Sequence, residues 1–129
     1  MPESFIRGAM TEATYLVLLS LTEVRHGYGV MQHITALTEG RVNLGVGTLY
    51  GAVNLLLEKG WIETAGGDDR RKLYVITPEG RRALEAELAR LTELVSIGQE
   101  ILAPDPAGNS EDRPARKQVR NHVRKQAHK

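Results

Sequence analysis

The chain has 129 residues, no cysteine and a formal net charge of +1. This length supports one modest core. The absence of cysteine excludes a disulfide framework and a thiol nucleophile, and the absence of disulfides fits a reducing compartment. The first residues lack the long apolar run of an export signal, and no segment approaches the roughly 20 apolar residues of a membrane span. We therefore expect a cytoplasmic protein that does not contact a membrane.

Charge is distributed unevenly along the chain. Residues 113–129 contain seven Lys or Arg and no Asp or Glu, and the ten basic and sixteen acidic residues before them give residues 1–112 a formal charge of about −6. We interpret 104–129 as a linker followed by a basic, disordered tail. This tail either attracts nucleic-acid phosphates or only aids solubility. Because the body is acidic, any nucleic-acid contact must come from local clusters of cations.

Two helices are predicted in the first 40 residues. Thr11 fits an N-cap and Glu12 is favourable in the first turn. The following run is apolar on most sides, as in a buried helix, and we expect it to end near Arg25. A second, amphipathic helix follows over 28–37, with apolar residues at positions 30, 31, 34 and 37. Residues 40–45 are predicted to form a turn.

A third helix is predicted over 47–60, and Gly60 is expected to end it. At about 100° per residue, one face is apolar and is assigned to the core. Its members are Val46, Leu49, Val53, Leu56 and Leu57. The opposite face carries Gly47, Gly51, Asn54 and Glu58. It is small at its N-terminal half, so the backbone there can closely approach another surface, such as a DNA major groove.

The opening turn of this third helix is suited to an anion. It offers the hydroxyls of Thr48 and Tyr50, together with backbone N-H groups that have no partner inside the helix. These N-H groups lie at the positive end of the helix dipole, which favours phosphate. Three short helices, the last two joined by a brief turn, match the helix-turn-helix plan.

A β-hairpin, or wing, is predicted after the third helix. Residues 61–65 and 72–77 alternate as two strands, and 66–69 has strong turn chemistry. Arg70, Arg71 and Lys72 fall at the tip or on the second strand, where they can reach a phosphate backbone. The alternative is a solvated turn whose cations are balanced by the neighbouring aspartates.

A long final helix is predicted to begin at Thr77-Pro78-Glu79, which combines a cap, a proline at the first helical position and an acid in the first turn. Its apolar stripe has near-heptad spacing. The stripe consists of Leu84, Leu88, Leu91, Leu94, Val95 and Leu102, with Ile97 and Ile101 beside it. We expect the same helix of a second subunit to cover it; the alternative is that the helix folds back on its own domain. The predicted domains are 1–78 and 79–103.

Four motifs resemble the PadR family of transcriptional regulators. They are Arg7-Gly8, His26-Gly27-Tyr28-Gly29, Gly47-Thr48-Leu49-Tyr50 and the run from Tyr74 to Gly80, and the resemblance covers about residues 4–102. It implies a mainly α fold with a small β-hairpin, namely a winged helix-turn-helix plus a long C-terminal dimerisation helix. It also implies a homodimer that binds an inverted-repeat operator in double-stranded DNA as a repressor, released by a small molecule of unknown identity.

The resemblance also assigns roles to matching positions. It implies DNA contacts from the third helix at Thr48 and Tyr50, contacts from the wing at the three cations from Arg70 to Lys72, and a backbone contact near Tyr28. Gly45-Val46 stands where family members often have Ser or Pro, and Leu55 stands where many have Arg or Lys. The only tryptophan is Trp61, so the final helix has no aromatic platform for a flat drug.

Other classes of function fit less well. His26 and His33 are seven residues apart without a convincing third metal ligand, the carboxylates of the final helix have the spacing of a solvated face, and no phosphate-binding glycine loop occurs. We expect no catalytic residue, no metal and no cofactor. The second hypothesis is a winged helix that docks a protein through Gly51, Asn54 and Leu55. Tyr28, Tyr50 and Tyr74 have core packing as their alternative.

Overall fold

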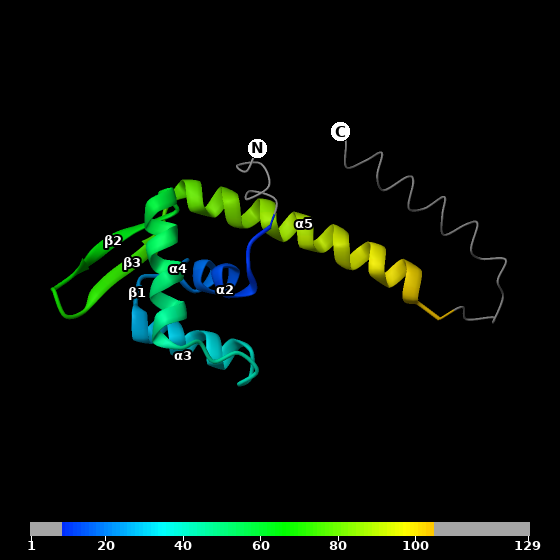
Figure 1. Ribbon diagram of the computed structural model, residues 1–129. Coiled ribbons are helices and arrows are strands. Elements are labelled where there is room, and N and C mark those ends of the chain that lie inside the picture. The colour runs from blue at the N-terminus through cyan, green and yellow to red at the C-terminus, as the bar shows by residue number, and fades with distance from the viewer. Residues whose placement is uncertain (1–8, 105–129) are drawn as a thin grey trace. The chain divides into compact units, whose positions relative to one another are not determined.

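The computed structural model describes residues 9–104, so Arg7-Gly8 and the predicted basic tail lie outside the described residues. The elements, in chain order, are α2 (Glu12–Ser20), β1 (Arg25–His26), α3 (Gly27–Leu37), α4 (Val46–Lys59), β2 (Ile62–Gly67), β3 (Lys72–Ile76) and α5 (Pro78–Leu102) (Figure 1). The predicted mainly α fold with a small antiparallel sheet and a long final helix is confirmed. The chain divides inside α5 into two compact units, and the boundary in the sequence lies between Glu87 and Leu88.

The helix boundaries follow from local capping. The Thr11 hydroxyl accepts the N-H of Thr14 at 3.1 Å and thereby caps α2. Gly60 ends α4 in the left-handed conformation at φ 75°, which glycine adopts without steric cost. The Thr77 hydroxyl accepts the N-H of Gly80 at 3.0 Å at the start of α5. These three predicted boundaries are confirmed.

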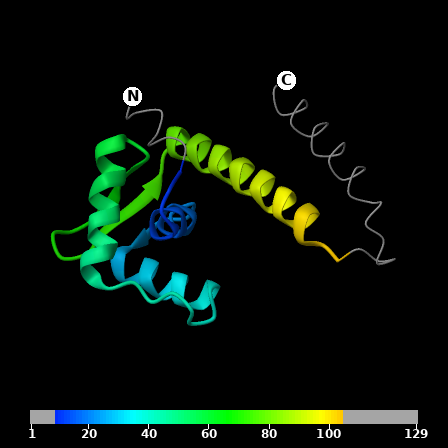
Figure 2. The same cartoon turned by 45° about the vertical axis from the view of Figure 1, so that its right-hand side comes forward.

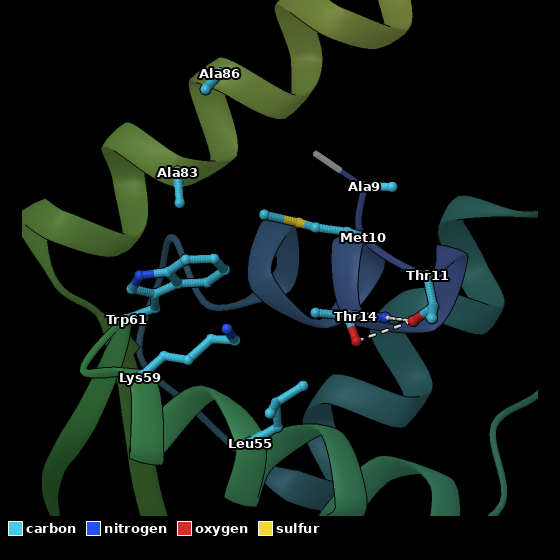
Figure 3. A pocket seen from close by; sticks show the side chains of 9 residues that line it. All are labelled: Ala9, Met10, Thr11, Thr14, Leu55, Lys59, Trp61, Ala83 and Ala86. Carbon is cyan, nitrogen blue, oxygen red and sulfur yellow. Dashed lines mark hydrogen bonds between the residues drawn. The ribbon is translucent and has the colours of Figure 1, made fainter. Parts of the chain in front are cut away.

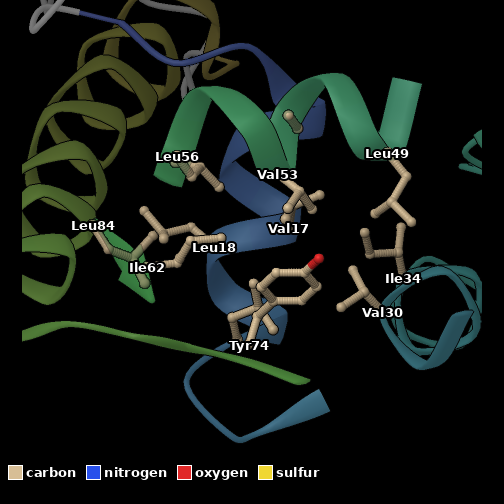
Figure 4. Packing of buried hydrophobic residues seen from close by; sticks show 12 residues of the cluster. Val17, Leu18, Val30, Ile34, Leu49, Val53, Leu56, Ile62, Tyr74 and Leu84 are labelled. Carbon is tan, nitrogen blue, oxygen red and sulfur yellow. The ribbon is translucent and has the colours of Figure 1, made fainter. Parts of the chain in front are cut away.

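The core of the first unit brings together side chains from every helix and from the sheet (Figure 4). Its members are Val17, Leu18, Leu21, Val30, Ile34, Leu49, Ala52, Val53, Leu56, Ile62, Tyr74 and Leu84. Figure 2 shows α2 nearly end-on beside α3 and α4, which run in clearly different directions. Burial of this apolar surface is the main stabilising contribution to the unit.

Two residues predicted to face the core do not. Val46 is 62% exposed, and Leu57 is 36% exposed. In α4, the buried side chains centre on Leu49, Val53 and Leu56 and include Ala52, so at 100° per residue Val46 and Leu57 project from the edge of that arc.

The wing belongs to a three-stranded antiparallel sheet with the order β1-β3-β2. The prediction that the first helix continues to about Arg25 is wrong, because α2 ends at Ser20 and Arg25 pairs with Tyr74 of β3. The Leu21 carbonyl also accepts the N-H of Ile76 at 2.7 Å. These are contacts between segments far apart in sequence, and local periodicity carries no signal of them.

The wing turn is shifted from its predicted place at 66–69. Strand β2 continues to Gly67, with an irregularity after Thr64, and the turn follows at 68–71 (Figure 1). Gly67 has φ 91°, and a Cβ there would lie 2.1 Å from the Arg71 carbonyl oxygen. Glycine is therefore required at this position, inside the strand rather than in the turn.

Candidate nucleic-acid interface

The outer face of α4 is small and open. Gly47, Thr48, Gly51 and Asn54 are all exposed. A Cβ added at Gly47 or Gly51 would meet nothing within 4 Å, so the packing of the chain itself does not demand glycine at either position. What the two glycines do provide is access to the backbone of α4 for another molecule.

The start of α4 has no side-chain cap. Its N-cap is Gly45, and no side chain accepts a hydrogen bond from the first turn. The N-H groups of this turn therefore remain available at the positive end of the helix dipole, close to the Thr48 side chain.

Two tyrosines near this face have different environments. Tyr50 is 40% exposed, and its hydroxyl oxygen lies only 2.3 Å from the position that a Cβ at Gly27 would take, so it packs on the first residue of α3. Tyr74 belongs to the core, and burial, followed by the effect of Tyr50, raises the pKa of Tyr74. Tyr28, by contrast, is 61% exposed at the start of α3.

The three wing cations are exposed. Asp68 Oδ1 accepts the backbone N-H groups of Arg70 and Arg71, each at 2.9 Å, so this carboxylate orders the turn. The ion pairs of Arg25 with Glu23 and of Arg41 with Glu12 include none of these cations. The side chains of Arg70, Arg71 and Lys72 therefore form no ion pair with the described part of the chain.

His26 joins the wing to α3, a role that the sequence interpretation missed, because it treated this residue as part of a family motif and as a metal-ligand candidate only. His26 Nδ1 accepts the Gly29 N-H at 3.1 Å and so caps α3. His26 Nε2 lies 3.0 Å from Arg71 Nη2. The position of His26 before a helix was the available signal for the first contact, whereas the second depends on the pairing of β1 with β3.

A cavity of about 350 Å³ lies on another side of the first unit (Figure 3). It is lined by Ala9, Met10, Thr11, Thr14, Leu55, Lys59, Trp61, Ala83 and Ala86. The Lys59 ammonium lies 4.9 Å from the centre of the Trp61 ring, a cation-π distance. Leu55 faces this cavity together with Trp61 (Figure 3).

The second unit has an exposed apolar surface. Leu88, Leu94, Val95, Ile101 and Leu102 are each more than half exposed. Leu84, which the prediction placed in the same stripe, is 7% exposed and packs in the core of the first unit. It is therefore not available to a second subunit in this structure.

The profile of the family described as "Transcriptional regulator PadR-like family" matches residues 16–86, which is more than half of the chain. The chain belongs to the PadR-like family. Its winged helix is thus that of a DNA-binding transcriptional regulator, and the open face of α4 and the wing are the parts of this PadR-like fold that the family resemblance assigns to DNA.

Solved structures share this PadR-like fold. A transcriptional regulator from Clostridium thermocellum is 24% identical with a TM-score of 0.62 and covers 77% of this chain and 98% of its own. A PadR family regulator from Clostridium difficile R20291 is 20% identical with a TM-score of 0.62, covering 72% and 100%. One from Eggerthella lenta DSM 2243 is 25% identical with a TM-score of 0.61, covering 81% and 91%. Among curated proteins, no match was found.

Two further features are absent from the described part of this PadR-like protein. Among residues 9–104, no three or more His, Cys, Asp or Glu side chains are grouped so that they could hold a metal ion. None of the helices in that range is long and apolar enough to cross a membrane.

Proposed function

We propose that this PadR-like regulator binds an inverted-repeat operator as a homodimer and represses transcription. The observation that carries the proposal is the open face of α4, where Gly47 and Gly51 leave space that the chain itself does not use. A helix with such a face can lie deep in the major groove, where base edges are read. Thr48 and Asn54 on the same face supply hydrogen-bonding groups for bases or phosphates.

The wing contributes contacts that do not depend on base sequence. Arg70 and Lys72 are exposed and have no ion pair within residues 9–104, so each can approach a phosphate without first breaking one. The uncapped first turn of α4 is suited to a further phosphate. Because the body of the chain is acidic, binding depends on these few local contacts.

The homodimer is supported by the second unit considered by itself. Its exposed apolar side chains repeat along α5 every seven residues, as Leu88, Val95 and Leu102 do, which is the spacing of helices that pack against a like helix. A dimer with two-fold symmetry matches an operator with two half-sites, separated by about one DNA turn or a multiple of it.

Binding to the protein's own promoter tests the proposal. The purified chain is titrated with promoter DNA and with an unrelated duplex of equal length at two salt concentrations, while sedimentation gives the mass. We expect a dimer that prefers the promoter at the higher salt, and lower transcription from that promoter in a purified transcription reaction. Equal binding to both duplexes that salt abolishes would mean that only non-specific phosphate attraction operates, and would overturn the proposal.

The second candidate function is a winged helix that docks a protein. The face proposed for it combined Gly51 and Asn54 with Leu55. In the structure, Leu55 is 42% exposed and lines the cavity beside Trp61 (Figure 3). The rest of the proposed face is small and polar, and it fits a DNA groove better than an apolar protein interface, whose core is rich in aromatic and other apolar side chains.

A small-molecule effector fits the cavity beside Trp61 better than the exposed part of α5. The walls are mostly apolar, and Lys59 supplies one positive charge, so the fitting class is a compact molecule with an apolar body and an acidic group. The test is a thermal-shift titration with a set of aromatic and short aliphatic carboxylates. We expect stabilisation that Lys59→Met weakens. No shift with any carboxylate, or an equal shift in Lys59→Met, would exclude this cavity as the site for this class.

A further inference from the structure

His26 faces two hydrogen-bond donors at once. The Gly29 N-H points to Nδ1 at 3.1 Å, and an Arg71 guanidinium nitrogen lies 3.0 Å from Nε2. Both neighbours can act only as donors, because the nitrogens of a backbone amide and of a guanidinium do not accept hydrogen bonds.

A neutral imidazole cannot satisfy both donors. One of its nitrogens carries the proton and only the other accepts a hydrogen bond. With the proton on Nε2, His26 caps α3 through Gly29, but its N-H faces Arg71. With the proton on Nδ1, the ring accepts from Arg71 and α3 is left uncapped. The two contacts therefore exclude each other as full hydrogen bonds.

The surrounding structure keeps all three groups together. Strand pairing places His26 opposite Leu73 of β3. The Asp68 carboxylate holds the Arg71 backbone N-H at 2.9 Å, so the turn directs this arginine toward β1. On the other side, the imidazole ring lies 3.6–3.8 Å from where a Cβ of Gly29 would be, an ordinary contact distance.

We propose that His26 is a positioning residue that couples the wing to α3 through its tautomer. In the free protein, the two tautomers exchange, and Arg71 is held beside the start of α3 for part of the time. When Arg71 moves to a DNA phosphate, the Nε2-protonated form remains and α3 is fully capped. One proton leaves Nδ1 for water and another binds Nε2 from water, so the charge of His26 is unchanged. The DNA step of this inference rests on the proposed function.

This coupling reaches α4, the helix proposed to enter the DNA groove, through a short path. The helix that His26 caps begins at Gly27, and the Tyr50 side chain of α4 packs directly on Gly27. A firmer first turn of α3 therefore gives Tyr50 a firmer support when the wing engages DNA. The phosphate is the stronger partner for Arg71, because it carries negative charge and can accept two parallel N-H bonds from a guanidinium, whereas a neutral imidazole offers one uncharged acceptor nitrogen.

Nitrogen NMR of the histidine rings in the full chain tests the inference. The chain has four histidines, and the spectrum of His26→Asn assigns the His26 signals. For the free protein we expect averaged Nδ1 and Nε2 shifts, and for Arg71→Ala the shifts of the single Nε2-protonated tautomer. Hydrogen exchange of the Gly29 amide should slow severalfold in Arg71→Ala, because the uncapped form from which the amide exchanges is no longer populated. Arg70→Ala, the matched control, should change neither signal.

The outcomes separate this inference from the proposed function. If Arg71→Ala leaves the His26 shifts unchanged, or if the free protein already shows one tautomer, the inference is overturned whether or not the protein binds DNA. If Arg71→Ala has the expected effect, promoter DNA should produce the same single tautomer in the unmodified chain. Tight promoter binding that leaves averaged shifts would overturn the DNA step alone, and absence of promoter binding would instead count against the proposed function.

Discussion

His33 shows how one side chain makes stability depend on pH. The Ser20 hydroxyl donates to the Leu16 carbonyl at 2.9 Å, so His33 Nδ1 is the donor in its 2.9 Å contact with Ser20 Oγ. Burial and then the positive charge of Arg25 lower the pKa of His33 below 6.5, and these effects outweigh the opposing effect of Glu23. The folded protein therefore binds this proton less tightly than the unfolded chain does.

Acid should weaken the fold through this residue. Stability rises with pH wherever the unfolded chain binds more protons, so the contribution of His33 is present above pH 6.5 and disappears as the pH falls below that value. We expect the free energy of unfolding, measured with urea at pH 7.5 and 5.5, to differ less in His33→Gln than in the parent chain. An identical difference in both proteins would show that His33 does not contribute.

Tyr50 allows the hydroxyl to be tested apart from the ring. The Tyr50 hydroxyl and the ring carbon that carries it both pack against Gly27, and Phe keeps the contact of that ring carbon, so Tyr50→Phe should change the free energy of unfolding by no more than about 0.5 kcal/mol. If the hydroxyl bonds a DNA phosphate, affinity for promoter DNA should fall about fivefold, equivalent to about 1 kcal/mol. Unchanged affinity in a fluorescence anisotropy titration would leave Tyr50 with packing as its role.

At the scale of elements, α4 separates stability from DNA binding. Ala is the better residue inside a helix, so Gly51→Ala should stabilise the fold by about 0.5–1 kcal/mol, because its Cβ enters open space. The same Cβ should lower DNA affinity if the α4 backbone lies against the groove. Equal or higher affinity in the more stable variant would show that this face does not approach DNA closely.

Gly80 provides the matched control for that experiment. A Cβ at Gly80 would lie 2.0 Å from the Trp61 carbonyl oxygen, so Gly80→Ala should destabilise the fold by at least ~2 kcal/mol. Urea denaturation measures both changes. Gly51→Ala and Gly80→Ala are expected to change stability in opposite directions. Because Gly51→Ala should be more stable than the parent chain, a decrease in its DNA binding cannot come from loss of folding and can be assigned to the interface.

The wing should determine part of the salt dependence. Arg70→Ala combined with Lys72→Ala should weaken binding to promoter and unrelated DNA alike. The slope of log affinity against log salt should fall in magnitude by about 0.9 for each phosphate that the wing no longer neutralises. Charge-preserving Arg70→Lys serves as the control and should keep most of the slope. An unchanged slope in the double variant would remove the wing from the DNA-binding surface.

At the scale of the whole molecule, the apolar side chains of α5 differ in exposure along its length. Leu84 is buried in the first unit, so Leu84→Ala should destabilise the fold by about 2–4 kcal/mol. Val95 and Leu102 are exposed, so Val95→Glu with Leu102→Glu should leave the fold of the first unit intact. That double variant should sediment as a monomer and bind the operator more weakly. A dimer that survives both charges would place the interface elsewhere.

Sequence patterns predicted most of the elements because helix boundaries depend on nearby residues. Thr11, Gly60 and Thr77 act within one helical turn of the boundary that each one sets. The assignment of a buried first helix and of the hairpin also followed from local periodicity. Exposure was harder to predict, as Val46 and Leu57 show, because the width of a buried arc depends on what packs against the helix.

Tertiary structure decided how the parts of the interface meet. Local chemistry placed three wing cations near a turn and a small face on α4, but it carried no signal that β1 exists or that His26 faces both Gly29 and Arg71. It also did not show that Leu84 is buried while Leu88 is exposed, or that Leu55 and Trp61 line one cavity. The reason is physical: capping and periodicity act over a few residues, whereas these contacts join segments that only folding brings together.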